Sequence, residues 1–226
     1  MISQIINRLH SELPATVKLV AVSKFHPFEA IEEAYSAGQR IFAESRPQEL
    51  QAKVLKLMEK GVDMNDVQWH FIGHLQTNKL KMVLPYVTLV QSVDSERLLA
   101  AIEAWADAND RVINVLLEPH VAAEETKQGF AAEEIYSILQ SAVEGGYPHI
   151  CFKGIMGMAT FTDDESVVRS DFSALKSIFE ECRMRFPSIT KDFVELSIGM
   201  SEDYQMAIEY GSTMVRIGSM IFGERV

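Results

Sequence analysis

A lysine at the end of an apolar run is the first residue of this sequence that could do chemistry. Lys24 closes the run Leu19-Val20-Ala21-Val22-Ser23-Lys24. Its aliphatic and β-branched side chains predict a strand that is covered on both faces. A lysine at the end of such a strand is either a solvated charge or a primary amine in a partly dry pocket. In the second case a lowered pKa lets the amine attack a carbonyl.

Two segments near the C-terminus carry residues that suit a phosphate. The first is Ser197-Ile198-Gly199-Met200-Ser201, which runs into a predicted helix. Glycine permits close backbone approach, serine offers hydroxyls and a helix N-terminus offers free N–H groups, so Ser197, Met200 and Ser201 are candidate phosphate-binding residues. The alternative is that Ser201 only caps the helix.

The second segment is Arg216-Ile217-Gly218-Ser219, in which an arginine interrupts an apolar run. Burying a guanidinium is costly unless it has a partner. That partner is either a ligand acceptor or a carboxylate of the protein. Together with Lys24, the two segments suit a phosphorylated aldehyde, because the amine can form an imine while the other residues hold the phosphate. Pyridoxal 5′-phosphate and a phosphosugar carbonyl both fit.

Other chemistry-bearing residues give weaker signals. His70 and His74 lie four apart without an obvious third ligand, so we expect no metal site. Cys151 and Cys182 lack the spacing of a zinc site or a disulfide framework. Lys127 follows a predicted strand and is either a second amine at the active face or a surface lysine.

The elements that must position these residues alternate between strand and helix. Apolar periodicity at Ile2, Ile5, Ile6, Leu9 and Leu13 predicts an N-terminal helix. Eight apolar runs, each followed by a helical pattern, predict strands at 18–24, 40–45, 68–73, 88–93, 111–118, 150–158, 193–198 and 214–222. Thr77 and Ser95 are predicted helix caps, and Pro27 and Pro47 are predicted first helical residues. We expect a long helix at 167–186 and a short one at 203–210.

Eight such units without a linker predict a single domain over residues 1–226, folded as a (β/α)₈ TIM barrel with an extra N-terminal helix. A doubly wound open sheet is the alternative, although no Gly-x-Gly-x-x-Gly follows the first strand. In a barrel, the carboxyl ends of the strands form the active face. We therefore expect Lys24, Ser45, Arg216 and the segment 197–201 to meet there.

Composition excludes several classes of function. The chain has 226 residues, a net charge of −11 and two cysteines. An acidic balance argues against a broad surface for nucleic acid or anionic lipid. No apolar run approaches the roughly 18 residues of a membrane span, and no signal peptide is visible. We expect a cytoplasmic protein.

Four motifs together resemble the YggS/PROSC family of pyridoxal phosphate homeostasis proteins. They are Ala21-Val22-Ser23-Lys24, the run from Trp69 to Lys79, Leu196-Ser197-Ile198-Gly199-Met200-Ser201-Glu202-Asp203, and the run from Gly211 to Gly218. The resemblance covers nearly the whole chain. It implies a barrel like the N-terminal domain of alanine racemase that binds pyridoxal 5′-phosphate.

The resemblance also assigns roles to individual residues. Lys24 matches the Schiff-base lysine, Ser201 with the Gly218–Ser219 backbone matches the phosphate site, and Arg216 matches an arginine near the pyridine nitrogen. Lys127 matches a loop lysine near the cofactor. Ser45 stands where the family usually has asparagine, and serine is shorter and lacks amide N–H donors.

The implied function is vitamin B6 homeostasis, in which the protein holds pyridoxal phosphate without significant turnover. The chain ends just after the barrel, so we expect no second domain that could bring a second acid–base group to the cofactor. No catalytic residues are therefore assigned. The alternatives are a racemase-like enzyme and a module that reports cofactor status to a partner. We expect a monomer that serves pyridoxal-phosphate-dependent apoenzymes.

Overall fold

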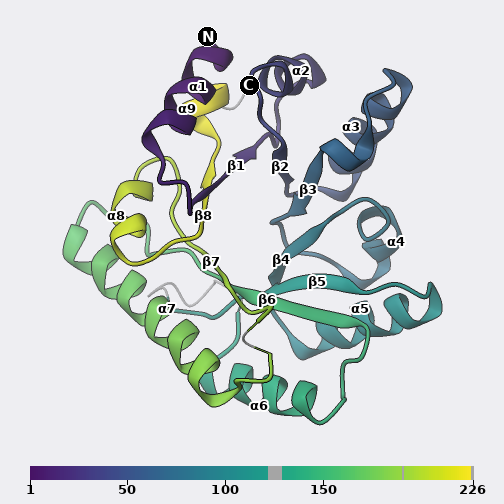
Figure 1. Cartoon of the computed structure of the whole chain (residues 1–226), viewed down its shortest axis with the longest axis vertical. Coiled ribbons are helices and arrows are strands. Elements are labelled where there is room, and N and C mark those ends of the chain that lie inside the picture. The colour runs from purple at the N-terminus through teal and green to yellow at the C-terminus, as the bar shows by residue number, and fades with distance from the viewer. Residues whose placement is uncertain (122–128, 190, 225–226) are drawn as a thin grey trace.

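A closed barrel of parallel strands forms the centre of the molecule. The computed structural model describes residues 1–121, 129–189 and 191–224. Neighbouring strands pair in chain order, and β1 pairs with β8 to close the ring (Figure 1). In the described residues the strands are β1 Lys18–Val22, β2 Ile41–Glu44, β3 Gln68–Phe71, β4 Leu89–Val93, β5 Ile113–Leu117, β6 Ile150–Met156, β7 Glu195–Ser197 and β8 Met214–Ile217. The predicted (β/α)₈ fold is confirmed.

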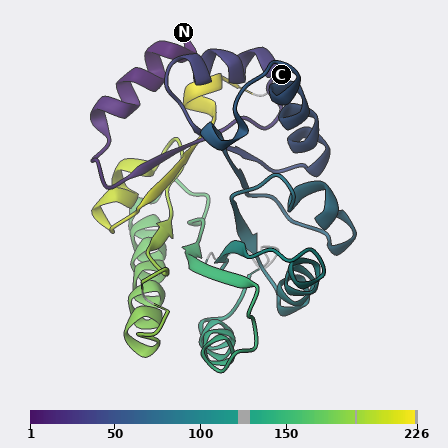
Figure 2. The same cartoon turned by 45° about the vertical axis from the view of Figure 1, so that its right-hand side comes forward.

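Helices surround the ring of strands, as Figure 2 shows. They are α1 Ile2–Glu12, α2 Phe28–Ser36, α3 Pro47–Glu59, α4 Leu80–Val83, α5 Glu96–Ala108, α6 Ala132–Val143, α7 Glu165–Arg185, α8 Tyr204–Glu209 and α9 Ser219–Phe222, with 3₁₀ turns at Met64–Asp66 and Thr77–Lys79. The extra N-terminal helix α1 buries Ile6 and Leu9 and packs against α2 and α9. None of the described helices is long and apolar enough to cross a membrane.

Alternating side chains divide the core into two parts. A small cluster contains only strand residues and fills the barrel interior: Val20, Val22, Ala43, Leu89, Leu116, Met156 and Met214. The strand residues between them, such as Leu19 and Ala21 of β1, belong to a larger cluster shared with the helices. This period of two decides which side chains reach the inside of the barrel. In β8, where Met214 faces inward, it also turns Arg216 inward.

Several predicted boundaries were wrong. The predicted strand 214–222 combines two elements, because β8 ends at Ile217 and α9 begins at Ser219. Both pieces are apolar, and Ile221 of α9 is buried, so hydrophobicity alone did not separate them. Strand β1 ends at Val22, since the chain turns at Phe25 with φ of 67°. Thr77 opens a 3₁₀ turn rather than capping a helix, and Pro27 is the N-cap of α2 rather than its first residue.

Other local predictions were confirmed. Ser95 caps α5, since its Oγ accepts from the N–H of Leu98 at 3.4 Å. Pro47 is the first residue of α3.

Gly154 in β6 has φ of 149°, and a Cβ there would lie 1.7 Å from the carbonyl oxygen of Glu195. It coincides with a register shift between β5 and β6, so this irregular pairing requires glycine.

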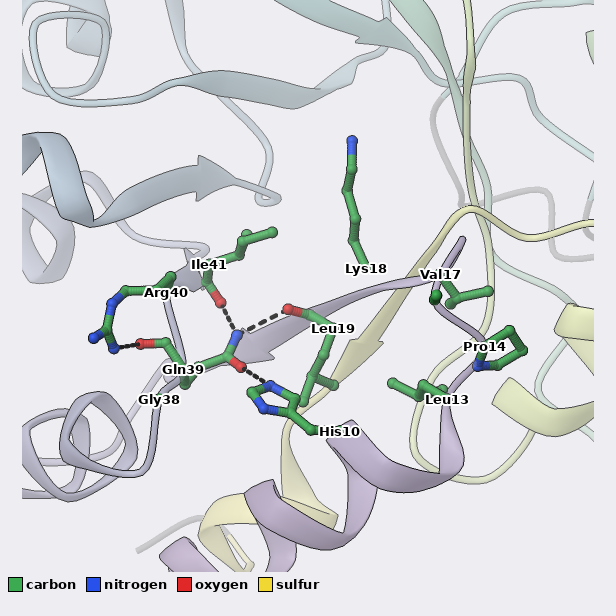
Figure 3. Close-up of a pocket in the computed structure, with 11 residues that line it drawn as sticks. His10, Leu13, Pro14, Val17, Lys18, Leu19, Gly38, Gln39, Arg40 and Ile41 are labelled. Atoms are coloured by element: carbon green, nitrogen blue, oxygen red, sulfur yellow. Dashed lines mark hydrogen bonds between the residues drawn. The ribbon is translucent and has the colours of Figure 1, made fainter.

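A cavity of about 270 Å³ lies at the amino ends of β1 and β2 (Figure 3). The Gln39 side chain spans its wall, donating to the carbonyl oxygens of Leu19 at 2.8 Å and Ile41 at 2.6 Å. Its Oε1 lies 3.0 Å from Nε2 of His10. These contacts satisfy strand carbonyls and fasten α1 to the barrel. We therefore assign this end of the molecule to stability, in keeping with the rule for TIM barrels.

Candidate functional site

Lys24 lies at the barrel mouth, the face formed by the carboxyl ends of the strands. It is half-buried in the turn that follows β1. The N–H of Ser23 donates to the carbonyl of Ala43 in β2, and the N–H of His26 donates to the carbonyl of Ser23, which closes the turn on itself. Phe25, with φ of 67°, has the left-handed conformation that is uncommon for a large side chain. This turn needs support from elsewhere in the fold.

A buried charged cluster behind the turn supplies that support. Nζ of Lys53, on α3, donates to the carbonyl of Ser23 at 2.8 Å and to Oε1 of Glu44 at 2.7 Å. The Ser23 hydroxyl donates to the same Oε1 at 2.6 Å, and Oε2 of Glu49 accepts from the N–H of Phe25 at 2.9 Å. Burial raises the pKa of the Glu44 carboxyl, while Lys53 and Ser23 oppose the shift. The cluster fixes the backbone on both sides of Lys24.

Sequence analysis missed Lys53 and Glu49. A signal was present, because Lys53 falls on the apolar face of α3 beside the buried residues Leu50, Val54 and Leu57. A lysine on such a face needs a buried partner. Glu44, at the end of β2, was the available carboxylate.

Arg216 of β8 crosses the inside of the barrel and is only 4% exposed. One terminal nitrogen donates to the carbonyl oxygen of Ser197 at 2.7 Å and to its hydroxyl at 2.8 Å. The other donates to the carbonyl of Gly157 at 2.9 Å. Burial lowers the pKa of Arg216 to about 10, so the guanidinium stays charged at neutral pH. Among the described ion pairs none includes Arg216; its described hydrogen bonds go to Ser197 and Gly157, while the charge of Glu118 raises its pKa and so opposes the effect of burial.

The hydrogen bonds continue from Arg216 to the far side of the barrel. The Ser197 hydroxyl donates to Oε1 of Gln91 at 2.7 Å, and Nε2 of Gln91 lies 2.8 Å from Nδ1 of His70. Since a guanidinium can only donate, the order of donors along this chain is fixed, and Nδ1 of His70 must accept. Burial lowers the pKa of His70 to about 3, which keeps the ring neutral as this order requires.

Glu118 faces the same interior just after β5. Burial raises the pKa of its carboxyl to about 7; the charge of Arg216 opposes this shift and that of Asp94 adds to it. Sequence analysis assigned no role to Glu118, which is the last residue of the predicted strand 111–118. The structure singles it out as a mouth carboxyl whose charge changes near neutral pH.

The candidate phosphate segment has a different geometry from the predicted one. Ser201 does not cap α8, which begins at Tyr204. Its Oγ instead accepts from the N–H groups of Gly218 at 3.4 Å and Met220 at 3.5 Å, and so links the loop after β7 to the start of α9. These bonds are long, so both donors remain available for a stronger acceptor.

The other predicted residues are distributed around this site. Ser197 is buried in the Arg216 chain, Met200 and Ser219 are exposed, and Ser45 is half-buried on the β2 side of the mouth. Lys127 lies outside the described residues. His70 and His74 do not meet, since His74 pairs with Asp94, and no three metal-ligating side chains gather in the described part of the chain.

Comparisons with known proteins agree with this architecture. A sequence model of the family described as "Alanine racemase, N-terminal domain" matches residues 2–226. A protein of Pasteurella multocida named pyridoxal phosphate homeostasis protein is 35% identical over 93% of this chain and 88% of its own length. A human protein of the same name is 38% identical over 99% of this chain and 82% of its own length.

A solved structure is similar over the same extent. It is PipY of Synechococcus elongatus PCC7942 with PLP bound. It matches with a TM-score of 0.89 and 30% identity, over 99% of this chain and 100% of that one.

Replacing Lys53 by methionine tests the cluster behind the lysine turn. Lys53→Met leaves the Glu44 carboxylate buried without its cation, and we expect the free energy of unfolding to fall by about 3–5 kcal/mol in urea denaturation. The double variant Lys53→Met/Glu44→Met is expected to recover part of this loss. Lys56→Met, at an exposed position on the same helix, is the control and should cost no more than about 1 kcal/mol, because it loses only a cation–π contact with Phe28. A loss no larger than the control's would contradict a role for the cluster.

The raised pKa of Glu118 predicts a pH-dependent stability. Between its ordinary value of 4.5 and about 7, the folded protein keeps a proton that the unfolded chain has lost. The contribution of Glu118 to stability is therefore full below pH 4.5 and is lost as the pH rises to about 7. We measure the unfolding free energy of Glu118→Gln and of the unsubstituted protein from pH 4.5 to 8. The value for the variant minus that for the unsubstituted protein should increase steadily between pH 4.5 and about 7. Glu180→Gln, exposed on α7, should show a constant difference; a constant difference for Glu118→Gln as well would refute the assignment.

Proposed function

Because this chain belongs to the alanine racemase N-terminal domain family and, within it, to the pyridoxal phosphate homeostasis proteins, we propose that it binds pyridoxal 5′-phosphate at the barrel mouth and holds it without significant turnover. The observation that carries the proposal is the placement of a lysine, a buried arginine and a set of backbone donors around one barrel end. The binding of PLP by PipY, a relative of the same fold, supports it.

The residues present fit this cofactor. A Cβ on Gly218 would lie 3.1 Å from the carbonyl oxygen of Val22, so the close approach of this segment to β1 favours glycine. In that position the N–H groups of Gly218 and Met220 and the Ser201 hydroxyl form a donor set for a phosphate. Ser197 belongs to the site through Arg216, while Met200, Ser219 and Ser45 are proposed to line it.

When bound, the cofactor supplies an aldehyde that condenses with a primary amine to a reducible Schiff base and water. We assign that amine to Lys24, whose backbone is held by Lys53 and Glu49. Three of the five N–H donors of Arg216 bind Ser197 and Gly157, so within the described residues two remain for a ligand acceptor. The family resemblance suggests that Arg216 would lie near the pyridine nitrogen of the bound cofactor, and a donor-only arginine there would keep that nitrogen unprotonated.

The remaining parts of the proposal concern the cellular role. We propose a single-domain, monomeric, cytoplasmic protein that supplies PLP-dependent apoenzymes, without binding nucleic acid or membranes. The net charge of −11 supports the exclusion of nucleic acid. Lys127 is proposed as a second amine near the cofactor on the basis of the family resemblance.

Borohydride reduction tests the assignment of Lys24. Protein incubated with pyridoxal phosphate, reduced and digested should carry the pyridoxyl mass on the peptide that contains Lys24. Lys24→Ala should lose this mass and the yellow colour of the loaded protein, whereas Lys176→Ala, at a partly exposed lysine of α7, should keep both. Modification found only at other lysines would refute the assignment.

Amino-acid racemisation tests the absence of turnover. An unprotonated pyridine nitrogen makes the cofactor a poor electron sink, and racemisation needs proton donors on both faces of the substrate. We expect the purified, loaded protein to form no substantial D-alanine from L-alanine by chiral chromatography, with an alanine racemase as positive control. Substantial D-alanine would instead support the racemase-like alternative.

A further inference from the structure

We infer that a second cavity at the barrel mouth binds a small oxyanion, a carboxylate or a phosphate, through His74 and Arg97. The cavity has a volume of about 410 Å³ and lies between the loop after β3 and the start of α5. It is lined by His74, Leu75, Gln76, Thr77, Asn78, Asp94, Ser95, Arg97 and Leu98. It shares no residue with Ser201 and Gly218, so it is a different site from the proposed phosphate position.

A buried carboxylate orients the histidine of this cavity. Nδ1 of His74 lies 2.9 Å from Oδ2 of Asp94, whose side chain is 6% exposed while that of His74 is 56% exposed. The other oxygen of Asp94 accepts from the Ser95 hydroxyl at 3.1 Å. Each oxygen of the Asp94 carboxylate therefore already has a hydrogen-bond partner within the protein. With Nδ1–H donated to Asp94, a proton on Nε2 gives an imidazolium placed between this carboxylate and a bound anion.

The rest of the lining favours an anion over a cation. The titratable groups that line the cavity are His74, Asp94 and Arg97, and the only carboxylate among them already has two partners. The remaining polar side chains are two amides and two hydroxyls, from Gln76, Asn78, Thr77 and Ser95; all can donate, although the Ser95 hydroxyl already donates to Asp94. The Arg97 guanidinium beside such donors, together with a histidine that Asp94 orients, forms a set that matches a carboxylate or a phosphate.

The position of the cavity suggests how it relates to the proposed cofactor site. It lies on the β3–β4 side of the mouth, four strands around the ring from the β7–β8 side that carries Ser201 and Arg216. Glu118 connects the two sides, because its carboxyl interacts with the charges of both Asp94 and Arg216. The cavity thus opens on the same face and would take a second small anion. This inference does not require that the cofactor be bound.

Histidine NMR with simple anions tests the site directly. The Cε1–H signal of His74 is identified as the one missing from His74→Gln, and the full-length protein is titrated with sodium phosphate or sodium acetate at constant ionic strength. We expect a saturable shift with at least one probe. Saturation by phosphate alone identifies a phosphate ligand, and saturation by acetate alone identifies a carboxylate ligand. Arg97→Gln should weaken the apparent affinity about tenfold, as expected for the loss of a charged hydrogen bond.

Two matched variants make the result decisive. Arg8→Gln, an exposed arginine of α1, controls for the loss of a surface charge and should leave the affinity unchanged. Ser201→Ala alters only the proposed cofactor phosphate position and should also leave the His74 titration unchanged. No saturable shift with either probe, an Arg97→Gln affinity equal to that of Arg8→Gln, or a titration lost in Ser201→Ala would overturn the inference. None of these outcomes depends on labelling of Lys24.

Discussion

The buried guanidinium of Arg216 is the constraint to which much of the barrel interior conforms. It lies among aliphatic and methionine side chains, where an unpaired charge is costly. Two carbonyl oxygens and one hydroxyl accept hydrogen bonds from the guanidinium. The same hydroxyl donates to Gln91, which in turn donates to His70. Because arginine can only donate, every group in this chain has one permitted role. This polar network can be satisfied in only one direction. It therefore specifies a single arrangement of the four strands that carry it.

Two buried cations among the described residues, Lys53 and Arg216, are stabilised in different ways, and each suits its position. Lys53 has a carboxylate partner, so its charge is largely neutralised and its remaining donor holds the backbone of the Lys24 turn. Arg216 has neutral acceptors, so its positive charge persists in the interior. The first arrangement fixes the position of an amine without adding charge. The second creates a field that attracts an acceptor to the mouth.

The sequence was sufficient for the strand order because each strand is a local apolar run that glycine, proline or a capping residue separates from the next helix. It also revealed Arg216, since a charge within such a run is visible without a structure. It could not reveal the partners of Arg216, because Gln91 and His70 meet it only when the sheet closes and brings β3 and β4 opposite β8. The alternative of Ser201 as a helix cap was wrong for a similar reason. The N–H groups that donate to its hydroxyl belong to Gly218 and Met220, far along the chain, whereas a capping pattern is judged from neighbours in sequence.

Proton affinities at the mouth also separate binding from catalysis. Arg216 stays charged because burial lowers its pKa only to about 10, and His70 stays neutral because burial lowers its pKa to about 3, so neither changes its protonation state near neutral pH. A general acid or base needs a pKa close to the working pH. Among these three interior groups only Glu118, with a pKa of about 7, meets that condition. Under the proposed function, the interior therefore provides fixed charges and oriented donors, which suit the retention of a phosphorylated aldehyde better than its conversion.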